Sequence, residues 1–548
     1  MDKRFFLALL LSLIVVALSQ LLFPVARTTP KAAPAAPAAT TAAPASGGAA
    51  VQSTVQPAAA IAPATDSGRA QPKIVETHSS IQTDKSVYTF TNIGAAPLSA
   101  VMLEYANRSP GDGKVELAAR DSKLLRYGLA LPSDTVSLEK VAFDAKLDHR
   151  ADGTSILTYT TTVRANTIRI AYTSGAGPYS LKVTGSVTGV TAGAYLVVSL
   201  PSTLRASEAD TNSDQRSLGY VFKRTRDRPG SVPFGKLDPG EKRLETGPLD
   251  WVAVKNKYFV FGLVSDKNPF TEVSFVGGAR TSKIATHAEA AIVQSLPQGA
   301  FSFVVYAGPQ ETTRLAAMGK DFDHVNPYGW KFLQPVVHPV ASLVIQLLLW
   351  MHNALQLSYG WVLIILGLVV RLVLWPLNQS TMRSTLRMQA VQPKLEAAKK
   401  RHKDPKQQQE AIMRVYQEEG ISPLAPLIGC LPALLPMPVF FALFFVFQNT
   451  IEFRGVPFLW LHDLSTKDPL YLIPLLMGVS MYVLSWIGMR NAPPNPQTKM
   501  MGYMFPVMMT VLLLNMASGL NLYYTAQNLA ALPQQWLLSR ERLRASSG

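Results

Sequence analysis

The sequence predicts a polytopic α-helical membrane protein with six transmembrane helices and a large all-β domain outside the cytoplasm. Hydrophobic residues make up 48% of the 548 residues. Many of them gather in runs near the roughly 20 residues that a helix needs to cross a bilayer. Short segments rich in β-branched and aromatic residues fill residues 73–325, between the first two runs. The formal net charge of +16 fits cytoplasmic loops rich in Lys and Arg.

Residues 1–26 are predicted to form an N-terminal transmembrane anchor. The basic start Met1–Arg4 precedes an apolar run from Phe5 to Phe23, as in a signal peptide or a signal anchor. The run is long for a signal peptide and a clean A-x-A cleavage motif is missing, so we expect an uncleaved anchor with a cytoplasmic N-terminus. Residues 27–72, mainly Ala, Pro, Thr and Gly, are predicted to be a disordered linker, because they cannot bury enough apolar surface to offset the entropy of ordering.

Residues 73–325 are predicted to form one large antiparallel β-sandwich, which should lie outside the cytoplasm because it follows the first span. The segments that predict strands are Val87–Phe90, Thr167–Tyr172, Leu196–Val198, Tyr258–Phe261 and Phe301–Tyr306. No catalytic constellation is visible among them. The chain has one cysteine, Cys430, and its eight His residues are scattered, so an internal disulfide is excluded and neither a metal site nor a cofactor is expected.

Residues 326–358 are predicted to form an interfacial amphipathic helix just before the second span. Leu343, Gln346, Leu347 and Trp350 follow helical spacing, and polar residues interrupt the apolar sequence. The alternative is a further membrane span. It would put the basic loop after the next helix on the wrong side of the membrane.

Residues 359–548 form the predicted membrane core. Its spans are predicted at 359–378, 424–447, 469–489, 501–516 and 520–538. Four prolines must bend or unwind the first half of the span predicted at 424–447. The last apolar stretch is too long for one crossing, and Ser518-Gly519 divides it. Together with the anchor, these spans place both termini in the cytoplasm and agree with the charge of every short loop.

The most basic stretch of the chain follows Pro376 and predicts a cytoplasmic helical hairpin at residues 393–420. Pro393 can start its first helix, Asp404-Pro405 can cap the second, and Gly420 can end it. Its basic residues include Lys394, Lys399, Lys400 and Arg401. The hairpin is either a solvated charged loop or a landing surface for anionic headgroups or a partner, and the sequence favours neither.

Arg371 is the residue that points to function, because it lies inside an apolar run from Trp361 to Leu377. An Arg at the centre of a membrane helix costs about 2.5–3.5 kcal/mol on insertion scales. Either the side chain snorkels to the near headgroups, or it marks a wet cationic site that awaits an anionic partner. The predicted spans offer it no carboxylate. They offer a polar lining on the last span that includes Asn521, Tyr524, Gln527 and Asn528.

The chain resembles the YidC family of membrane protein insertases of Gram-negative bacteria over almost its whole length. The resemblance rests on Tyr328-Gly329-Trp330, Trp375-Pro376-Leu377, Gln392-Pro393-Lys394, Met437-Pro438, Leu461-His462-Asp463-Leu464-Ser465, Ser518-Gly519-Leu520 and Tyr523-Tyr524. Each segment is weak alone. Their order, with a large external domain between the first two spans, makes the match specific.

The resemblance implies a five-helix core with a hydrophilic groove open to the cytoplasm and to lipid but closed to the outside. Arg371 would line this groove, and we assign Met437, Pro438 and Trp460 to it as well. The external domain would be a periplasmic β-supersandwich. Two positions depart from relatives: Pro436 stands where some have Gln, and Gly367 where some have Thr.

We therefore expect an inner-membrane insertase and chaperone that catalyses no reaction and needs no nucleotide, since no G-x-x-x-x-G-K-[ST] motif occurs. Expected partners are nascent inner-membrane proteins, Sec translocon components, the lipid bilayer and a ribosome or targeting factor at the cytoplasmic face, with no direct nucleic-acid binding. A passive assembly scaffold is the main alternative. A solute transporter or an intramembrane protease fits less well, because the spans lack acidic coupling or catalytic residues.

Overall fold

The computed structural model describes residues 75–376, 391–418, 437–490 and 496–547, except positions 112, 120–121, 133, 191–192, 281–283, 327, 329–332, 392–393, 396, 399–400 and 402–403. The predicted anchor and linker, Pro436 and the hairpin residues Lys399 and Lys400 lie outside the described residues. The chain divides into two compact units. One unit contains the β-domain and most apolar helices, and the other contains the hairpin.

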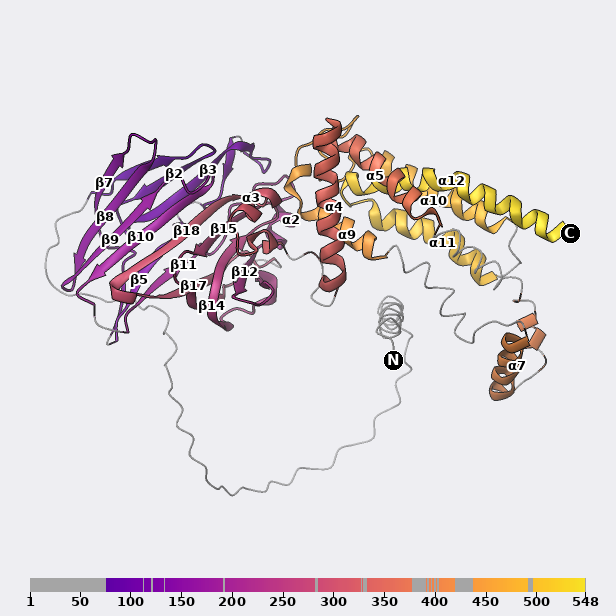
Figure 1. Cartoon of the computed structure of the whole chain (residues 1–548), viewed down its shortest axis with the longest axis horizontal. Coiled ribbons are helices and arrows are strands. Elements are labelled where there is room, and N and C mark those ends of the chain that lie inside the picture. The colour runs from indigo at the N-terminus through magenta and orange to yellow at the C-terminus, as the bar shows by residue number, and fades with distance from the viewer. Residues whose placement is uncertain are drawn as a thin grey trace, which may run out of the picture. The chain divides into compact units, whose positions relative to one another are not determined.

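The β-domain contains two antiparallel sheets (Figure 1). The small sheet has the order β1 (His78–Gln82), β2 (Ser86–Thr91), β3 (Ala96–Ala106) and β4 (Lys114–Glu116). The large sheet has the order β6 (Thr135–Ser137), β5 (Arg126–Ala130), β11 (Tyr195–Ser199), β17 (Ala288–Ser295), β16 (Phe270–Gly277), β14 (Lys242–Lys255), β15 (Phe259–Ser265), β18 (Ala300–Pro309), β10 (Ser180–Thr188), β9 (Asn166–Thr173), β8 (Ser155–Val163) and β7 (Asp144–His149). In addition, β12 (Gly219–Arg224) pairs with β14 and with β13 (Gly230–Pro233).

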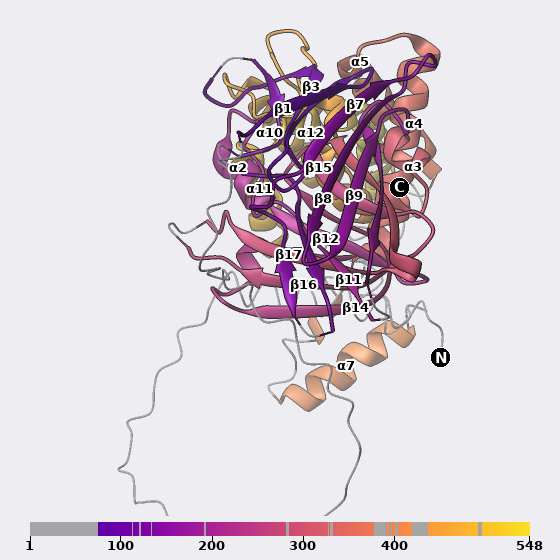
Figure 2. The same cartoon turned by 90° about the vertical axis from the view of Figure 1, so that its left-hand side faces the viewer.

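The strands form where the sequence alternates or is continuously apolar. In β8 every second residue from Ser155 to Tyr159 is buried, whereas all residues of the central strand β15 are buried. The two sheets share one apolar core (Figure 2). Phe90 of β2 packs against Tyr172 of β9 with ring centroids 4.7 Å apart, which ties the small sheet to the large one. The predicted β-rich domain is therefore confirmed.

Short helices also occur within or directly after the β-domain sequence. They are α2 (Thr211–Arg216), η1 (Phe234–Lys236), η2 (Pro297–Gly299), α3 (Thr312–Ala317) and η3 (Phe322–Val325).

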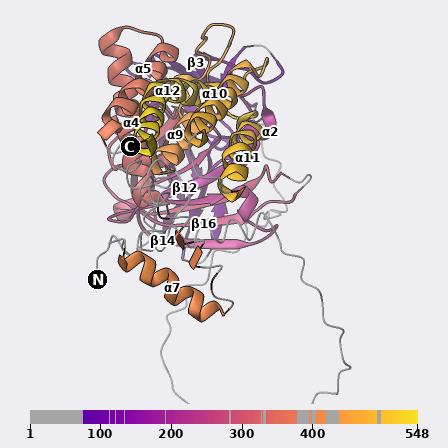
Figure 3. The ribbon, with the colours of Figure 1, turned by 90° about the vertical axis from the view of Figure 1, so that its right-hand side faces the viewer.

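The apolar helices follow the β-domain (Figure 3). They are α4 (Gln334–Leu355), α5 (Tyr359–Val373), α9 (Met437–Asn449), α10 (Leu472–Met489), α11 (Pro496–Leu513) and α12 (Ser518–Ser547), and η4 (Ile451–Phe453) lies between α9 and α10. Among the described residues, α4 and α10 are long and apolar enough to cross a membrane, and residues 359–373, 439–449 and 502–513 form shorter apolar helices.

The last two helices are separated earlier than the sequence suggested. Ser518-Gly519 was the expected division, but both residues already belong to α12. The backbone N–H groups of Ser518 and Gly519 donate to the carbonyl oxygens of Thr466 (2.7 Å) and Leu464 (3.0 Å). Since the first N–H groups of a helix lack partners within it, these loop carbonyls allow α12 to begin here.

Helix α4 runs across α5 and α12 rather than alongside them (Figure 1 and Figure 2). Its inward stripe is Val337, Ala341, Ile345, Leu348 and Met351, all buried. The stripe recognised in the sequence instead includes Leu343 and Trp350, which are exposed. Both faces of α4 are therefore apolar. The exposed face suits contact with lipid, whether the helix crosses the membrane or lies at its surface.

The hairpin unit contains α7 (Pro405–Glu418) and helical turns at Val391, Leu395 and Arg401. Tyr416 of α7 packs against Val391 and Leu395, with Ile412 and Val415 beside it. The apolar stripe that the sequence indicated on the second helix thus forms a small core of its own.

Candidate functional site

Arg371 lies in the last turn of α5 and is partly buried. Its Nη2 donates a hydrogen bond of 2.7 Å to Oε1 of Gln534 on α12. The Gln534 side chain is only 3% exposed, and its Nε2 lies 3.4 Å from the carbonyl oxygen of Trp375. Among the described residues, Nε of Arg371 has no hydrogen-bond partner. Within the described part of the chain, the cation is therefore held by a neutral amide and not by a carboxylate.

Helices α5 and α12 approach closely one turn before this contact. A Cβ atom on Gly367 would lie 3.1 Å from the carbonyl oxygen of Tyr523 and 3.3 Å from the Cβ of Ala526. Small residues permit such close packing between membrane helices. Gly367 thus allows the two helix backbones to come together one turn before Arg371.

The Arg371 side chain extends toward the C-terminal ends of both helices. Gly367 contacts the backbone of α12 near Gln527. From there Arg371 is four residues further along α5, and Gln534 is seven residues further along α12. At 1.5 Å per residue these steps are about 6 Å and about 10 Å. Gln534 thus lies further along the pair of helices than the Cα atom of Arg371. The arginine side chain reaches across this difference, so its charge lies nearer the C-terminal ends of the helices than its Cα atom does.

The asparagines predicted to line the same site lie elsewhere on α12. Nδ2 of Asn521 donates to the carbonyl oxygen of Leu513 at the end of α11 (3.0 Å). Nδ2 of Asn528 donates to Oγ of Ser480 on α10 (3.1 Å). Both side chains tie α12 to its neighbours, which is a common role of polar residues between membrane helices. The structure does not bring them to Arg371.

The other predicted groove residues are scattered. Tyr524 packs against Phe440 of α9 with tilted rings whose centroids are 5.5 Å apart, and Gln527 is partly buried on the α12 face that meets α5. Trp460 lies in the loop between α9 and α10, where its Nε1 donates to Asp468 (3.2 Å). The side chains of Met437 and Pro438, at the start of α9, lie outside the described residues.

Sequence reasoning missed Gln534, although a signal was present. Gln527 and Gln534 are seven residues apart and therefore share one face of α12. In the hairpin, Lys394 and Arg401 are exposed.

The loop from Thr450 to Tyr471, here called the α9–α10 loop, docks on the β-domain through a buried ion pair. Arg454 has a side chain only 3% exposed, and its Nε donates to Oε1 of Glu208 (2.8 Å), whose side chain is 8% exposed. In a second ion pair the cation, Arg108, belongs to the β-domain and the anion, Asp463, belongs to the loop. The loop therefore connects the helices to the β-domain at two points.

Glu452 lies in η4, two residues before Arg454, and is partly buried. Its Oε1 accepts a hydrogen bond of 3.4 Å from the backbone N–H of Thr312, and Oε2 has no partner among the described residues. Burial raises the pKa of Glu452 to about 7.

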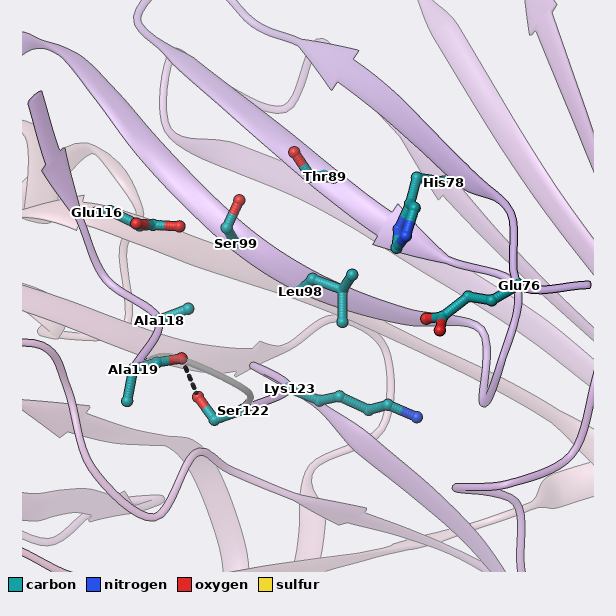
Figure 4. Close-up of a pocket in the computed structure, with 10 residues that line it drawn as sticks. All are labelled: Glu76, His78, Thr89, Leu98, Ser99, Glu116, Ala118, Ala119, Ser122 and Lys123. Carbon is teal, nitrogen blue, oxygen red and sulfur yellow. Dashed lines mark hydrogen bonds between the residues drawn. The ribbon is translucent and has the colours of Figure 1, made fainter.

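A surface pocket of about 630 Å³ lies over the small sheet (Figure 4). Its lining residues are Glu76, His78, Thr89, Leu98, Ser99, Glu116, Ala118, Ala119, Ser122 and Lys123. Three of its charged groups already have partners within the β-domain. Nζ of Lys123 donates to two backbone carbonyls, Glu116 pairs with Arg205, and Glu76 accepts from Thr91. These groups stabilise the fold, so the pocket is a weaker candidate than Arg371. Across the described ranges, no group of three or more His, Cys, Asp or Glu residues is arranged to hold a metal ion.

Two family models match the chain. The model of the 60Kd inner membrane protein matches residues 350–545, and the model of the YidC periplasmic domain matches residues 78–338. The membrane protein insertase YidC of Chloroherpeton thalassium is 30% identical over 505 residues, covering 84% of this chain and 82% of its own length. The insertase YidC of Chlorobaculum tepidum is 30% identical over 497 residues, covering 83% and 80%. A solved structure of an active YidC insertase with its first transmembrane domain resolved is 20% identical, covers 84% of this chain and 93% of its own, and has a TM-score of 0.34.

Proposed function

The chain belongs to the YidC family of membrane protein insertases, and from this premise we propose that it inserts newly made proteins into the inner membrane by means of the charge on Arg371. The observation that carries the proposal is the hydrogen bond between the Arg371 guanidinium and the neutral Gln534 amide. No bond in a substrate is made or broken. The protein lowers the cost of bringing a polar tail into the membrane.

Electrostatics favours this role over a purely structural one. A buried charge is costly unless it is paired, and a carboxylate would be the ordinary partner. An amide satisfies one N–H group but leaves the full positive charge. An acidic residue in a substrate tail would therefore be attracted to Arg371. A membrane potential, worth about 2.3 kcal/mol per charge per 100 mV, would then assist its movement to a positive outside.

The apolar part of a substrate would leave along the helices into lipid. Met500, Met504 and Met508 form an exposed stripe on α11 at i, i+4 and i+8. Methionine side chains are unbranched and adapt to irregular apolar partners. Together with the Phe-rich α9 they form a surface on which different substrate helices can slide. Burial of apolar area, worth about 25 cal/mol per Å², supplies the driving force.

We infer the topology from the charge of the loops. The hairpin and both termini lie in the cytoplasm, the β-domain is a periplasmic supersandwich, and six helices cross the membrane with α4 at its surface. The crossing orientation of α4 relative to α5 supports the interfacial assignment. Under this arrangement the exposed Lys394 and Arg401 face the side from which substrates arrive. A ribosome, a targeting factor or anionic headgroups would bind there, and Sec translocon components are expected partners within the membrane.

The test is reconstitution of the purified protein in liposomes with two single-span substrates whose tails differ by one Asp. Relief of even half the cost of an intramembrane Asp, about 1.4 kcal/mol, is a tenfold effect. Arg371→Ala should lower protease-protected insertion of the Asp-bearing substrate about tenfold and affect the neutral one less. Arg371→Lys should retain much of the activity, because it keeps the charge.

Two outcomes would contradict the proposal. If Arg371→Ala matched the unchanged protein for the Asp-bearing substrate, Arg371 would be an interfacial anchor whose removal is harmless or stabilising. If the unchanged protein inserted neither substrate, it would be a passive scaffold.

A further inference from the structure

We propose that Gln534 is a positioning residue that holds the Arg371 guanidinium in place while keeping its charge available to an acidic substrate group. The inference rests on the proposed function of Arg371 and deepens it. Gln534 is buried on α12, and its amide contacts α5 at one end and Trp375, just after α5, at the other. Its oxygen accepts from Arg371, and its nitrogen points to the carbonyl oxygen of Trp375.

The second contact explains how the amide is held. Trp375 lies just beyond α5, which ends at Val373, and belongs to the helical turn that follows. Its carbonyl oxygen lies 3.4 Å from Nε2 of Gln534. An amide can donate to this oxygen and accept from the guanidinium at the same time, because it carries both a donor and an acceptor. The Gln534 amide is thus oriented by the carbonyl group of Trp375, and the amide oxygen in turn orients the arginine.

The chemistry of the alternatives shows why an amide suits the position. A carboxylate would form a closed ion pair with Arg371 and cancel the charge that attracts a substrate, since opposite charges interact strongly where water is scarce. An apolar side chain would leave the guanidinium without a fixed direction. A guanidinium has five N–H donors, and among the described residues only one has a partner. Because Nε is buried, a substrate carboxylate would accept from the remaining N–H groups of the two Nη atoms.

The chain offers a matched control on the same helix. Gln535 is the next residue, and its Nε2 lies 2.6 Å from the position that a Cβ on Gly488 of α10 would occupy. It therefore faces α10 and not α5. Gln535→Glu adds the same charge to the same turn of α12 without reaching Arg371.

The experiment uses full-length protein in liposomes with the same pair of substrates, at equal amounts of each folded variant. Gln534→Glu should lower insertion of the Asp-bearing substrate about tenfold, as Arg371→Ala does, and should lower insertion of the neutral substrate less than twofold. Gln535→Glu should leave the ratio between the two substrates unchanged. Gln534→Met, which keeps the length but removes both hydrogen bonds, should lower insertion of the acidic substrate about threefold.

The outcomes separate this inference from the function on which it rests. If Arg371→Ala abolishes the preference for the acidic substrate but neither Gln534 variant changes it, Gln534 is only a packing residue and the inference is wrong. If Arg371→Ala also leaves the preference intact, the proposed function fails. If Gln534→Glu does not fold, Gln534→Met decides, because a wild-type ratio in that variant overturns the positioning role.

Discussion

Replacement of Arg454 by Ala tests whether the α9–α10 loop, residues 450–471, fastens the helices to the β-domain. Arg454 donates to Glu208 (2.8 Å) and to the backbone carbonyls of Ala106 (2.9 Å) and Ser207 (3.2 Å). Its guanidinium also lies 5.4 Å from the ring centre of Phe259. After the substitution, the Glu208 carboxylate would stay buried without the arginine. Oγ of Ser207 would still donate a hydrogen bond to it.

The expected loss is large because the pair is buried. Removal of one partner of a buried ion pair costs about 3–5 kcal/mol, mostly because the remaining charge is uncompensated. The contact with Phe259 adds about 1 kcal/mol. If this free energy holds the loop on the β-domain, its loss should raise the open fraction of the loop by about three to four orders of magnitude, since 1.4 kcal/mol is a factor of ten.

Hydrogen–deuterium exchange of the detergent-solubilised protein measures this opening directly. Amides of residues 451–468 should exchange about a thousandfold faster or more in Arg454→Ala, while the strands of the large sheet keep their protection. The matched control is Arg164→Ala, which removes an ion pair with Asp134 whose side chains are 56% and 52% exposed. Exposed pairs contribute about 0–1 kcal/mol, so loop exchange should not change. Equal exchange in the two variants would refute the docking role.

Two further predictions concern protonation and topology. Burial raises the pKa of Glu452 from its ordinary 4.5 to about 7, so the folded state binds the proton more tightly and loop docking should weaken as the pH rises from 4.5 through 7, by up to about 3 kcal/mol. Glu452→Gln should abolish this slope in loop exchange between pH 6 and 8, and a variant that kept the wild-type slope would exclude Glu452 as its source. A cysteine placed at Lys400, after replacement of Cys430, should resist membrane-impermeant reagents in intact spheroplasts and react after lysis. Labelling from outside would overturn the whole span assignment.

The β-domain could be predicted from the sequence because strand burial follows local alternation. Four of the five segments that indicated strands lie wholly within β2, β9, β11 and β18, and only Tyr258 falls just before β15. The docking of the α9–α10 loop could not be predicted. Arg454 and Glu208 are 246 residues apart, and Arg108 and Asp463 are 355 apart. No periodicity connects charges at such separations, because their meeting depends on how two folded parts fit together.

Arg371 could be chosen as a candidate from the sequence because a charge inside an apolar run is costly wherever the helix lies. Its partner was not identified, because the choice depends on which side of α12 meets α5. Gly367 contributes to this by allowing a close backbone approach at Tyr523 and Ala526. A glycine in an apolar helix does not by itself predict a close contact between helices. The contact can be recognised only when the neighbouring helix is known.

The polar residues of α12 form two faces with different roles. In the sequence they were treated as one polar lining, and for this reason Gln534 was not identified. An α-helix turns about 100° per residue. With Asn521 at zero, Thr525 lies at about 40° and Asn528 at about −20°, whereas Gln527 and Gln534 lie at about 240° and 220°. The first face has a structural role. Asn521 and Asn528 bind α11 and α10, and Oγ1 of Thr525 donates to the carbonyl oxygen of Asn521 (2.7 Å).

The second face turns toward α5 and carries the residue that holds the charge. The two faces depend on each other. An arginine that must meet substrates at a fixed place needs a partner on a helix that does not rotate, and the bonds of the first face prevent α12 from rotating. A change at Asn528 should therefore weaken the function of Arg371 without touching it, through loss of the register between Gln534 and the end of α5.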